Sequence, residues 1–267
     1  ADVLFCKNEN RTLKDLTNMY DEEYVKSYNK SIEIIKEEYE KFPNQKYISI
    51  NKSTEIEPNE LFLMNENKTD FKGYNRYLKP LMDKITGEIF TKIEKMKGDT
   101  LKKKTGIILY LPQTQNTAKT MEIFSKKFNK KQFEVESLCS QPIGKSKKNA
   151  KEELMNKYKT KTLEEALIKR FEDCNEKKHL VILVKNMLEV GISLPFVDIV
   201  IKLHNSESAE KNIQQNFRCC TERKGKTEAY IIDYNYHNVF KTILYNFNPN
   251  NKKTTRELLK TIYDYEL

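Results

Sequence analysis

Short apolar runs alternate with segments of helical periodicity between Gly106 and Tyr234. The run at 106–111, GIILYL, is continuously apolar, and residues 117–128 then place apolar side chains at the spacing of an amphipathic helix. Runs this apolar, separated by helices, are typical of a mostly parallel sheet with helices on both faces. The sequence therefore predicts an α/β fold, with strands at 106–111, 133–138, 180–184, 197–203 and 229–234 and helices at 117–128 and 150–174.

The first hundred residues have a different pattern, in which polar and charged segments of helical periodicity predominate. Residues 12–41 are predicted to be helical, with one stripe of tyrosines and isoleucines that packs against other elements. A further helix is predicted over 74–97, interrupted by Pro80 and Gly87, and KYISI at 46–50 is predicted as an edge strand. We therefore expect a mainly helical linker or accessory region over 1–100 and an α/β domain over 101–267 that ends in an amphipathic helix.

Composition narrows the class of protein. The chain has 267 residues, and its 48 Lys and Arg against 39 Asp and Glu give a formal net charge of +9. A basic balance favours a polyanionic partner such as nucleic acid, although a general bias toward Lys, Asn and Ile explains much of the excess. The five cysteines form no CxxC pair and the three histidines have no ligand spacing, so we expect a reducing intracellular compartment and no metal site. No apolar run has membrane-spanning length.

One stretch resembles half of a phosphate-binding loop. CSQPIGKS follows a predicted strand and ends in Gly144, Lys145 and Ser146, as the pattern GxxxxGK[ST] requires. Cys139, however, stands where the pattern has its first glycine, and Pro142 removes a backbone N–H donor from the loop. A self-sufficient P-loop NTPase or kinase is therefore an alternative that this stretch supports only in part.

The stretch QQNFRCCTERKGKTEAYIIDYN (214–235) raises a second possibility. It predicts a short helix that carries Arg218 and Arg223, followed by a buried strand. Together with the preceding strands and loops, it resembles the C-terminal RecA-like domain of superfamily 2 helicases and translocases over about residues 101–240. The polar loop LPQTQNTAK resembles motif IV of that family. Motif V falls on 185–195 and motif VI on 214–221.

The match to these motifs is incomplete in ways that bear on ATP coupling. In motif V, Gly191, Ile192, Leu194 and Pro195 match, whereas Lys185 replaces the usual Thr and Ser193 the usual Asp. In motif VI, Gln214 and Arg218 match, whereas Phe217 replaces the glycine and Thr221 the second arginine. Arg223 lies two residues beyond Thr221 and is a candidate substitute for that arginine.

The resemblance implies the C-terminal motor domain of an ATP-dependent helicase, with ATP and Mg²⁺ held mainly by an N-terminal RecA-like domain of the same protein. An arginine suits the catalytic role because its planar fork binds phosphate bidentately and stays charged. The expected partner is DNA or RNA, as a single strand. The resemblance, together with the Lys/Asn-rich composition, implies a viral or plasmid-type protein that is cytoplasmic or virion-associated. The expected site residues are Arg218 and Arg223 for catalysis, Gly191, Ser193, Gln214 and Gln215 for the nucleotide, and Gln113, Thr114, Gly144, Lys145, Ser146, Lys185 and Asn186 for nucleic acid.

The departures in motif VI leave a further alternative, a helicase-like nucleic-acid-binding module without catalysis. Each candidate residue also has a purely structural interpretation, in which Arg218 and Arg223 are surface residues and Gly191 is a turn glycine. Asp233 and His204 have no nearby nucleophile–base partner in the sequence, and we expect them to be structural.

Overall fold

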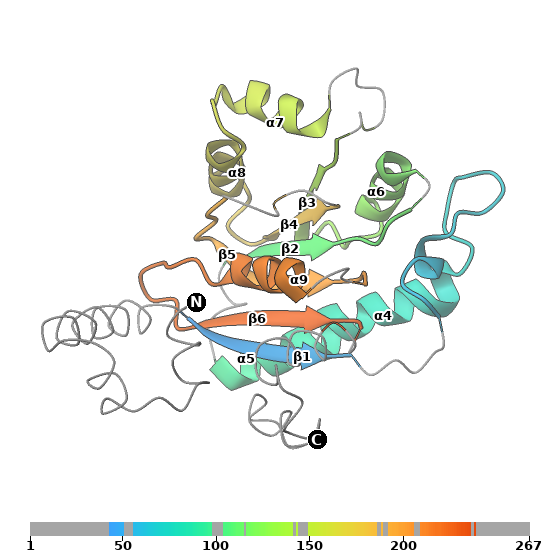
Figure 1. Ribbon diagram of the computed structural model, residues 1–267, viewed down its shortest axis with the longest axis horizontal. Helices are drawn as coiled ribbons and strands as arrows, with labels where there is room; N and C mark the ends of the chain where they lie inside the picture. Colours follow the sequence, from blue (N-terminus) through green and yellow to red (C-terminus); the bar gives the residue numbers. More distant parts are fainter. Residues whose placement is uncertain are drawn as a thin grey trace, which may run out of the picture.

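The computed structural model describes residues 43–50, 56–97, 104–114, 116–140, 143, 149–185, 188, 192–205, 209–235 and 238. The predicted helices at 12–41 and in the C-terminal tail lie outside these residues. The described residues form an α/β structure built around one sheet (Figure 1).

The sheet has six strands in the order β1-β6-β5-β2-β4-β3, and every neighbouring pair is parallel. The predicted mostly parallel sheet is confirmed. The strand β2 lies between β4 and β5, so that Ile108 is in register with Ile182 on one side and Val200 on the other. The strands are β1 (Asn44–Ser49), β2 (Gly106–Tyr110), β3 (Phe133–Leu138), β4 (His179–Val184), β5 (Val197–Lys202) and β6 (Glu228–Asp233).

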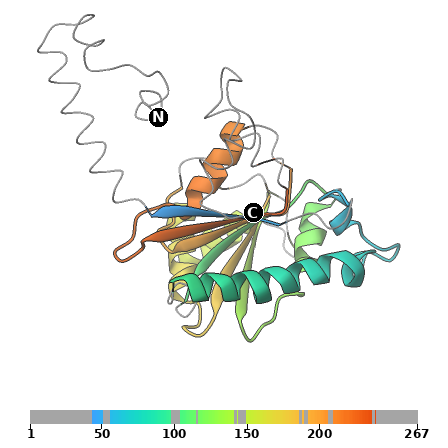
Figure 2. The same ribbon diagram turned by 90° about the horizontal axis from the view of Figure 1, so that it is seen from below.

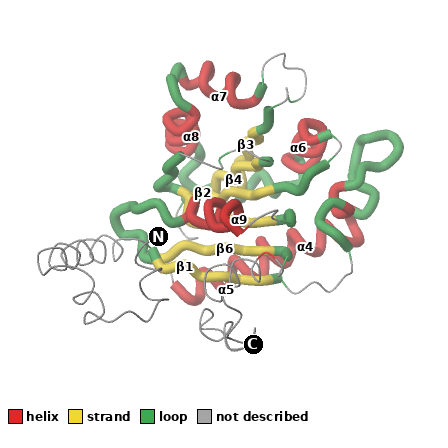
Figure 3. The backbone as a smooth tube through the Cα atoms, viewed as in Figure 1, coloured by secondary structure: helices red, strands yellow, loops and turns green. Residues whose placement is uncertain are grey.

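Helices cover both faces of the sheet, as Figures 2 and 3 show. On one face, α6 (Thr117–Ser125) and the helical rod from Tyr74 to Lys97 pack against the alternate strand residues typified by Ile107 and Ile199. On the other face, α7 (Ala150–Tyr158) and α8 (Leu163–Glu172) pack against residues typified by Ile182. The helix α9 (Ala209–Asn216) lies in front of β5 and β6 in Figure 1, and the 3-10 turn η4 (Phe217–Cys219) continues it. The helices on both faces are therefore confirmed, and the stretch predicted to be helical over 150–174 forms two helices, α7 and α8.

The helical rod between residues 74 and 97 runs through Pro80 and Gly87 without a break. It changes type instead, from η2 (Tyr74–Leu78, π) to α4 (Lys79–Asp83), η3 (Lys84–Ile89, π) and α5 (Phe90–Lys97). Pro80 lies in the first turn of α4, where a missing backbone N–H is tolerated. Pro80 and Gly87 were expected to interrupt the helix. The structure instead shows changes between π- and α-helical geometry.

Residues before 101 contribute to the same sheet and core as those after it. The strand β1 pairs with β6 along its whole length, which confirms the predicted edge strand. Buried side chains of the 74–97 rod, such as Ile85 and Ile93, belong to the same apolar cluster as Ile107 and Ile201. The expected division of the chain at residue 101 stays a prediction; among the described residues, the core runs across it.

Candidate site at the carboxyl edge of the sheet

All six strands end at the same edge of the sheet because they are parallel. Open α/β sheets bind ligands at this edge, where the strand order reverses. Here the chain leaves β2 in one direction, toward β3, and leaves β5 in the other, toward β6, so the order reverses between β2 and β5. The loops after β2, β4 and β5 therefore define the candidate site.

The loop after β2 and the residue after β4 come together at the start of α6. The Lys185 Nζ atom donates to Thr117 Oγ1 at 2.8 Å, and Thr120 Oγ1 donates to Thr114 Oγ1 at 3.1 Å. Asn116 caps the helix, because its side chain accepts from the Lys119 backbone N–H. Two stretches that the sequence linked to nucleic acid thus form one polar surface.

The ammonium group of Lys185 lies in a partly desolvated position. Burial lowers its pKa, and the nearby thiol of Cys139 has a smaller opposite effect. The positive end of the α6 dipole lies beside it, because Thr117 is the first residue of that helix. A cation, hydroxyl groups and a helix amino terminus together suit an anionic group such as a phosphate. Gln113, from the same loop, is exposed.

Arg218 lies in η4, immediately after α9, and its side chain turns toward the loop between β4 and β5. The guanidinium Nη1 donates to the carbonyl oxygen of Ile192 in a short contact. The backbone N–H of the next residue, Ser193, donates to a carboxylate oxygen of Glu164 at the start of α8, at 3.1 Å. The structure therefore joins the residue predicted as an arginine finger to the stretch predicted as motif V.

The two glutamines of α9 differ in their surroundings. Gln214 is exposed, whereas Gln215 is buried and its side chain interacts with His204. The ring of His204 lies 5.8 Å from that of Tyr110, between centroids. Burial, with repulsion from Lys202, lowers the pKa of His204 to about 3, so the imidazole is neutral at physiological pH. Of this pair, Gln214 is the one that a ligand reaches from solvent.

Arg223 is not on the helix with Arg218, and that part of the expectation is wrong. It lies in the loop before β6, and its Nη2 atom is 3.0 Å from both carboxylate oxygens of Asp198. Burial raises the pKa of Asp198, while Lys226 and Arg223 counteract part of that rise. Asp198 is the second residue of β5, so Arg223 lies at the amino edge of the sheet, opposite the candidate site. A catalytic role for Arg223 stays a prediction.

The structure also contains a buried polar cluster that sequence reasoning missed. Lys202 and Asp233, the last residues of β5 and β6, form an ion pair of 2.7 Å with both side chains fully buried. Asn212 of α9 and Asn238 complete the cluster by hydrogen bonds. Asp233 was expected to be structural, and this pairing agrees with that expectation. The available signal was Lys202 itself, a charge between Ile201 and Leu203 near the end of the run VDIVIKL.

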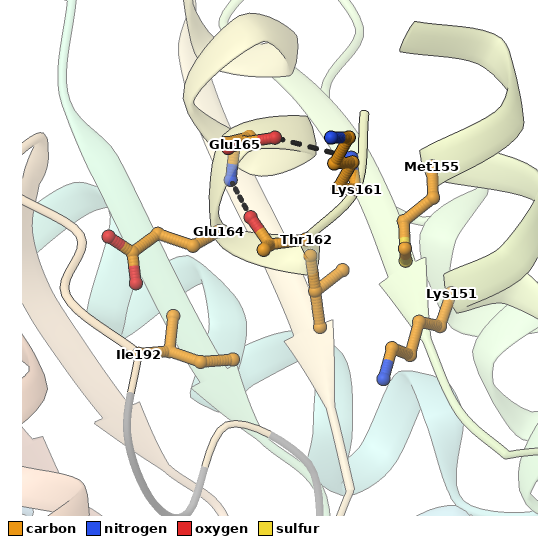
Figure 4. Close-up of a pocket in the computed structure, with 8 residues that line it drawn as sticks. Lys151, Met155, Lys161, Thr162, Glu164, Glu165 and Ile192 are labelled. Atoms are coloured by element: carbon orange, nitrogen blue, oxygen red, sulfur yellow. Dashed lines mark hydrogen bonds between the residues drawn. The ribbon is translucent and has the colours of Figure 1, made fainter. Parts of the chain in front are cut away.

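A cavity of about 530 Å³ opens between α7 and α8, beside the loop that Arg218 contacts (Figure 4). Its walls combine apolar side chains with charges of both signs, so it has no clear preference for an anion or a cation. The lining residues are Lys151, Met155, Lys161, Thr162, Leu163, Glu164, Glu165 and Ile192. Of the predicted site residues, none lines this cavity.

Five predicted site residues lie outside the described residues. They are Gly144, Lys145 and Ser146 of the partial phosphate loop, Asn186 and Gly191. Within the part of the chain that the structure describes, no three His, Cys, Asp or Glu side chains are grouped as metal ligands. The helices of that same part include none that is long and apolar enough to span a bilayer.

Comparisons with known proteins give little further information. No family model and no curated protein matches the chain. Among solved structures, the chain is similar to an ATP-dependent Type ISP restriction-modification enzyme, LlaBIII, bound to DNA, with 13% identity and a TM-score of 0.39. The match covers 83% of this chain and 14% of that enzyme. The chain therefore spans about a seventh of the length of that enzyme.

Proposed function

We propose that this chain is the C-terminal motor domain of an ATP-dependent nucleic-acid helicase or translocase. In this proposal Arg218 is the arginine finger for an ATP and Mg²⁺ held mainly by an N-terminal RecA-like domain. The observation that carries the proposal is the contact between the Arg218 guanidinium and the Ile192 carbonyl. That contact brings together two stretches whose sequences resemble helicase motifs V and VI, although 26 residues separate them.

The position of Arg218 suits a group that acts on a nucleotide held elsewhere. Arg218 is half-buried, and its Nη1 atom donates to the Ile192 carbonyl oxygen, whereas Arg223 pairs with the carboxylate of Asp198. The carbonyl contact orients the Arg218 guanidinium beside the stretch that resembles motif V, and a guanidinium is suited to bind phosphate. Phosphoryl transfer is accelerated by positive charge placed beside the negative charge that develops on the γ-phosphate. Such a site is complete only when two domains close on the nucleotide.

We further propose that nucleic acid lies along the surface at the start of α6. Lys185 and Thr114 would contact the phosphate backbone there, with Gln113 beside them. Asn186, Gly144, Lys145 and Ser146 are proposed as further nucleic-acid contacts on the sequence alone. Such contacts are largely independent of base sequence and weaken as salt rises. Ser193 and Gln214 are proposed to contact the nucleotide, as is Gly191 on the sequence alone. Gln215 is buried, and a nucleotide contact for it stays a sequence prediction.

The decisive experiment changes Arg218 in the protein that contains both RecA-like domains. We expect Arg218→Ala to reduce nucleic-acid-stimulated ATP hydrolysis by about a thousandfold or more, while binding of single strands is retained. Lys224→Ala is the matched control, because Lys224 is a nearby exposed cation outside the proposed site. Unchanged hydrolysis in Arg218→Ala would contradict the motor function.

The Phe217 and Thr221 departures favour a second candidate, a nucleic-acid-binding module without catalysis. That candidate predicts no hydrolysis in the wild-type protein and salt-sensitive binding of single strands that Lys185→Ala weakens. The P-loop alternative predicts that this chain alone binds ATP and loses that affinity in Lys145→Ala. The motor proposal predicts negligible hydrolysis by the chain alone and little effect of Lys145→Ala on its nucleotide binding.

A further inference from the structure

The helix that leads to Arg218 packs on the sheet through a polar face. Among its described side chains, 211–216, the fully buried ones are all amides, namely Asn212, Gln215 and Asn216. None of them belongs to the apolar cluster on this face of the sheet. Inside α9 the buried contacts are therefore polar, and the apolar cluster is joined after the helix, by Cys219 and Cys220.

The side chain of Asn212 in α9 bonds to one buried ammonium group, that of Lys202. The Nζ atom of Lys202 donates to Asn212 Oδ1 at 2.5 Å and pairs with Asp233 at 2.7 Å. Lys202 and Asp233 point toward α9, because Val200 and Ile231, two residues earlier on their strands, pack on that same face. Burial lowers the pKa of Lys202, and Asp233 opposes that shift.

The network continues from Asn212 to the segment after β6. Asn212 Nδ2 donates to the Asn238 carbonyl at 3.0 Å, and Asn238 Nδ2 donates to Asp233 Oδ1 at 3.1 Å. Asn238 Nδ2 also lies 2.9 Å from the carbonyl oxygen of His204, after β5. The network therefore ties α9 to the carboxyl ends of two strands at once.

A directional network of this kind fixes a position more strictly than it stabilises a fold. A buried ion pair is often nearly neutral for stability compared with apolar residues, because desolvation offsets the attraction. Hydrogen bonds, in contrast to apolar contacts, are lost when the partners move by about an ångström. The Lys202–Asn212 contact lies six residues before Arg218 on a continuous helical segment. A shift of α9 therefore displaces the guanidinium.

We propose that Lys202 and Asn212 are positioning residues for Arg218. They hold α9 at the one register on the sheet from which the guanidinium meets the γ-phosphate of bound ATP. This inference rests on the proposed motor function and extends it to residues that no motif includes. The ligand at Arg218 is a nucleoside triphosphate, and the network itself contacts no ligand.

The test measures ATP hydrolysis by Asn212→Ala in the protein that contains both RecA-like domains. We expect kcat to fall about tenfold or more, with KM for ATP changed less than about threefold. A misplaced guanidinium stabilises the transition state less but changes binding of the ground state little. The control is an Ile231 variant, Ile231→Val or Ile231→Ala, chosen for the same loss of melting temperature. Ile231 is buried in β6 on the same face but lies in the apolar cluster. If the matched control loses as much activity as Asn212→Ala, the inference is overturned.

Arg218→Ala in the same preparation separates the inference from the function on which it rests. If Arg218→Ala keeps its rate, the motor function fails and the inference with it. If Arg218→Ala is inactive while the hydrolysis rate of Asn212→Ala equals or exceeds that of the Ile231 control, only the inference fails.

Hydrogen exchange of this chain alone gives a second readout. The Cys220 amide bonds to the Phe217 carbonyl, and Asn212→Ala should increase its exchange more than that of amides in α8. Equal exposure in α8 and after α9 contradicts the inference.

Discussion

The helices α8 and α9 lie on the same face of the sheet but are held by different forces. The buried face of α8 consists of Leu163, Ala166 and Leu167, with Arg170 at its end. The buried side chains of α9 are amides, and one of them, Asn212, bonds to a buried lysine and to the backbone carbonyl of Asn238. Apolar burial stabilises a helix in proportion to area and tolerates small shifts, whereas a hydrogen-bond network specifies one arrangement.

The two helices also differ in the segment that follows each of them in the chain. After α8 the chain enters β4, a central strand of the core. After α9 it reaches Arg218, whose proposed role depends on the exact place of one guanidinium. The two helices therefore depend on different kinds of contact, and variants of each should fail in different ways.

The largest effect is expected at Lys202. The variant Lys202→Met leaves Asp233 buried without its counter-charge, which should lower the free energy of unfolding by about 3–5 kcal/mol. Urea denaturation of this chain measures it. The double variant Lys202→Met/Asp233→Asn should recover most of the loss, since no charge is then buried and the Asn235 and Asn238 donors keep an acceptor. Lys79→Met is the control, because the Lys79–Asp83 pair is exposed, and it should unfold like the wild type. If Lys202→Met lowers the free energy of unfolding only slightly, the buried network does not hold α9, and the contrast between α9 and α8 fails.

A core truncation in α8 should have the next largest effect. Leu167 is fully buried in the apolar cluster, and Leu167→Ala should cost about 3 kcal/mol in unfolding free energy because it leaves a cavity. The counterpart on α9 is Ile213→Ala, for which we expect about 1 kcal/mol, since that side chain is only partly buried. Urea denaturation of both variants gives the comparison. Equal losses would contradict the distinction between an apolar and a polar attachment.

The surroundings of α9 should also make stability depend on pH. The pKa of His204 is about 3 in the folded chain and 6.5 when unfolded, so the unfolded chain binds more protons between these values. Stability therefore falls as pH decreases through this window. His204 should account for about 2 kcal/mol of loss between pH 7 and pH 5. We expect His204→Phe to remove this part of the slope in urea titrations at the two pH values. An unchanged slope would show that the imidazole is accessible to protons in the folded chain.

The sequence predicted the elements of this fold better than it predicted the contacts of the site. The five strands after Gly106 and the edge strand at 46–50 follow from short-range patterns, which survive without knowledge of tertiary structure. The pairing of Arg223 with Asp198 spans 25 residues and depends on where the loop before β6 meets β5. Spacing from Arg218 alone therefore placed Arg223 on the wrong element.

The buried network was missed for a related reason. A lysine at the end of an apolar strand looks like a residue that emerges into solvent, and the asparagines of an Asn-rich chain look like composition bias. Only the register of β5 beside β6 brings Lys202 next to Asp233, and only the placement of α9 supplies Asn212. By contrast, Lys185 and the loop at Thr114 were predicted for the same surface, because the ends of parallel strands share one edge.

The smallest loss of unfolding free energy is expected at the amino terminus of α8, where a local hydrogen bond caps the helix. Thr162 accepts from the Glu165 backbone N–H at 3.2 Å, and the Glu165 side chain accepts from the Lys161 backbone N–H at 3.2 Å (Figure 4). Removing the cap in Thr162→Ala should cost about 1 kcal/mol in urea denaturation, because one helix N–H loses its partner. Thr162→Ser is the control, since it keeps the hydroxyl and should stay close to the wild type. The cap lies on the helix held by apolar contacts, so Thr162→Ala should leave the kcat of ATP hydrolysis unchanged, whereas Asn212→Ala should lower it. A lower kcat in Thr162→Ala would show that α8 also sets the position of Arg218, through the Glu164–Ser193 contact beside Ile192.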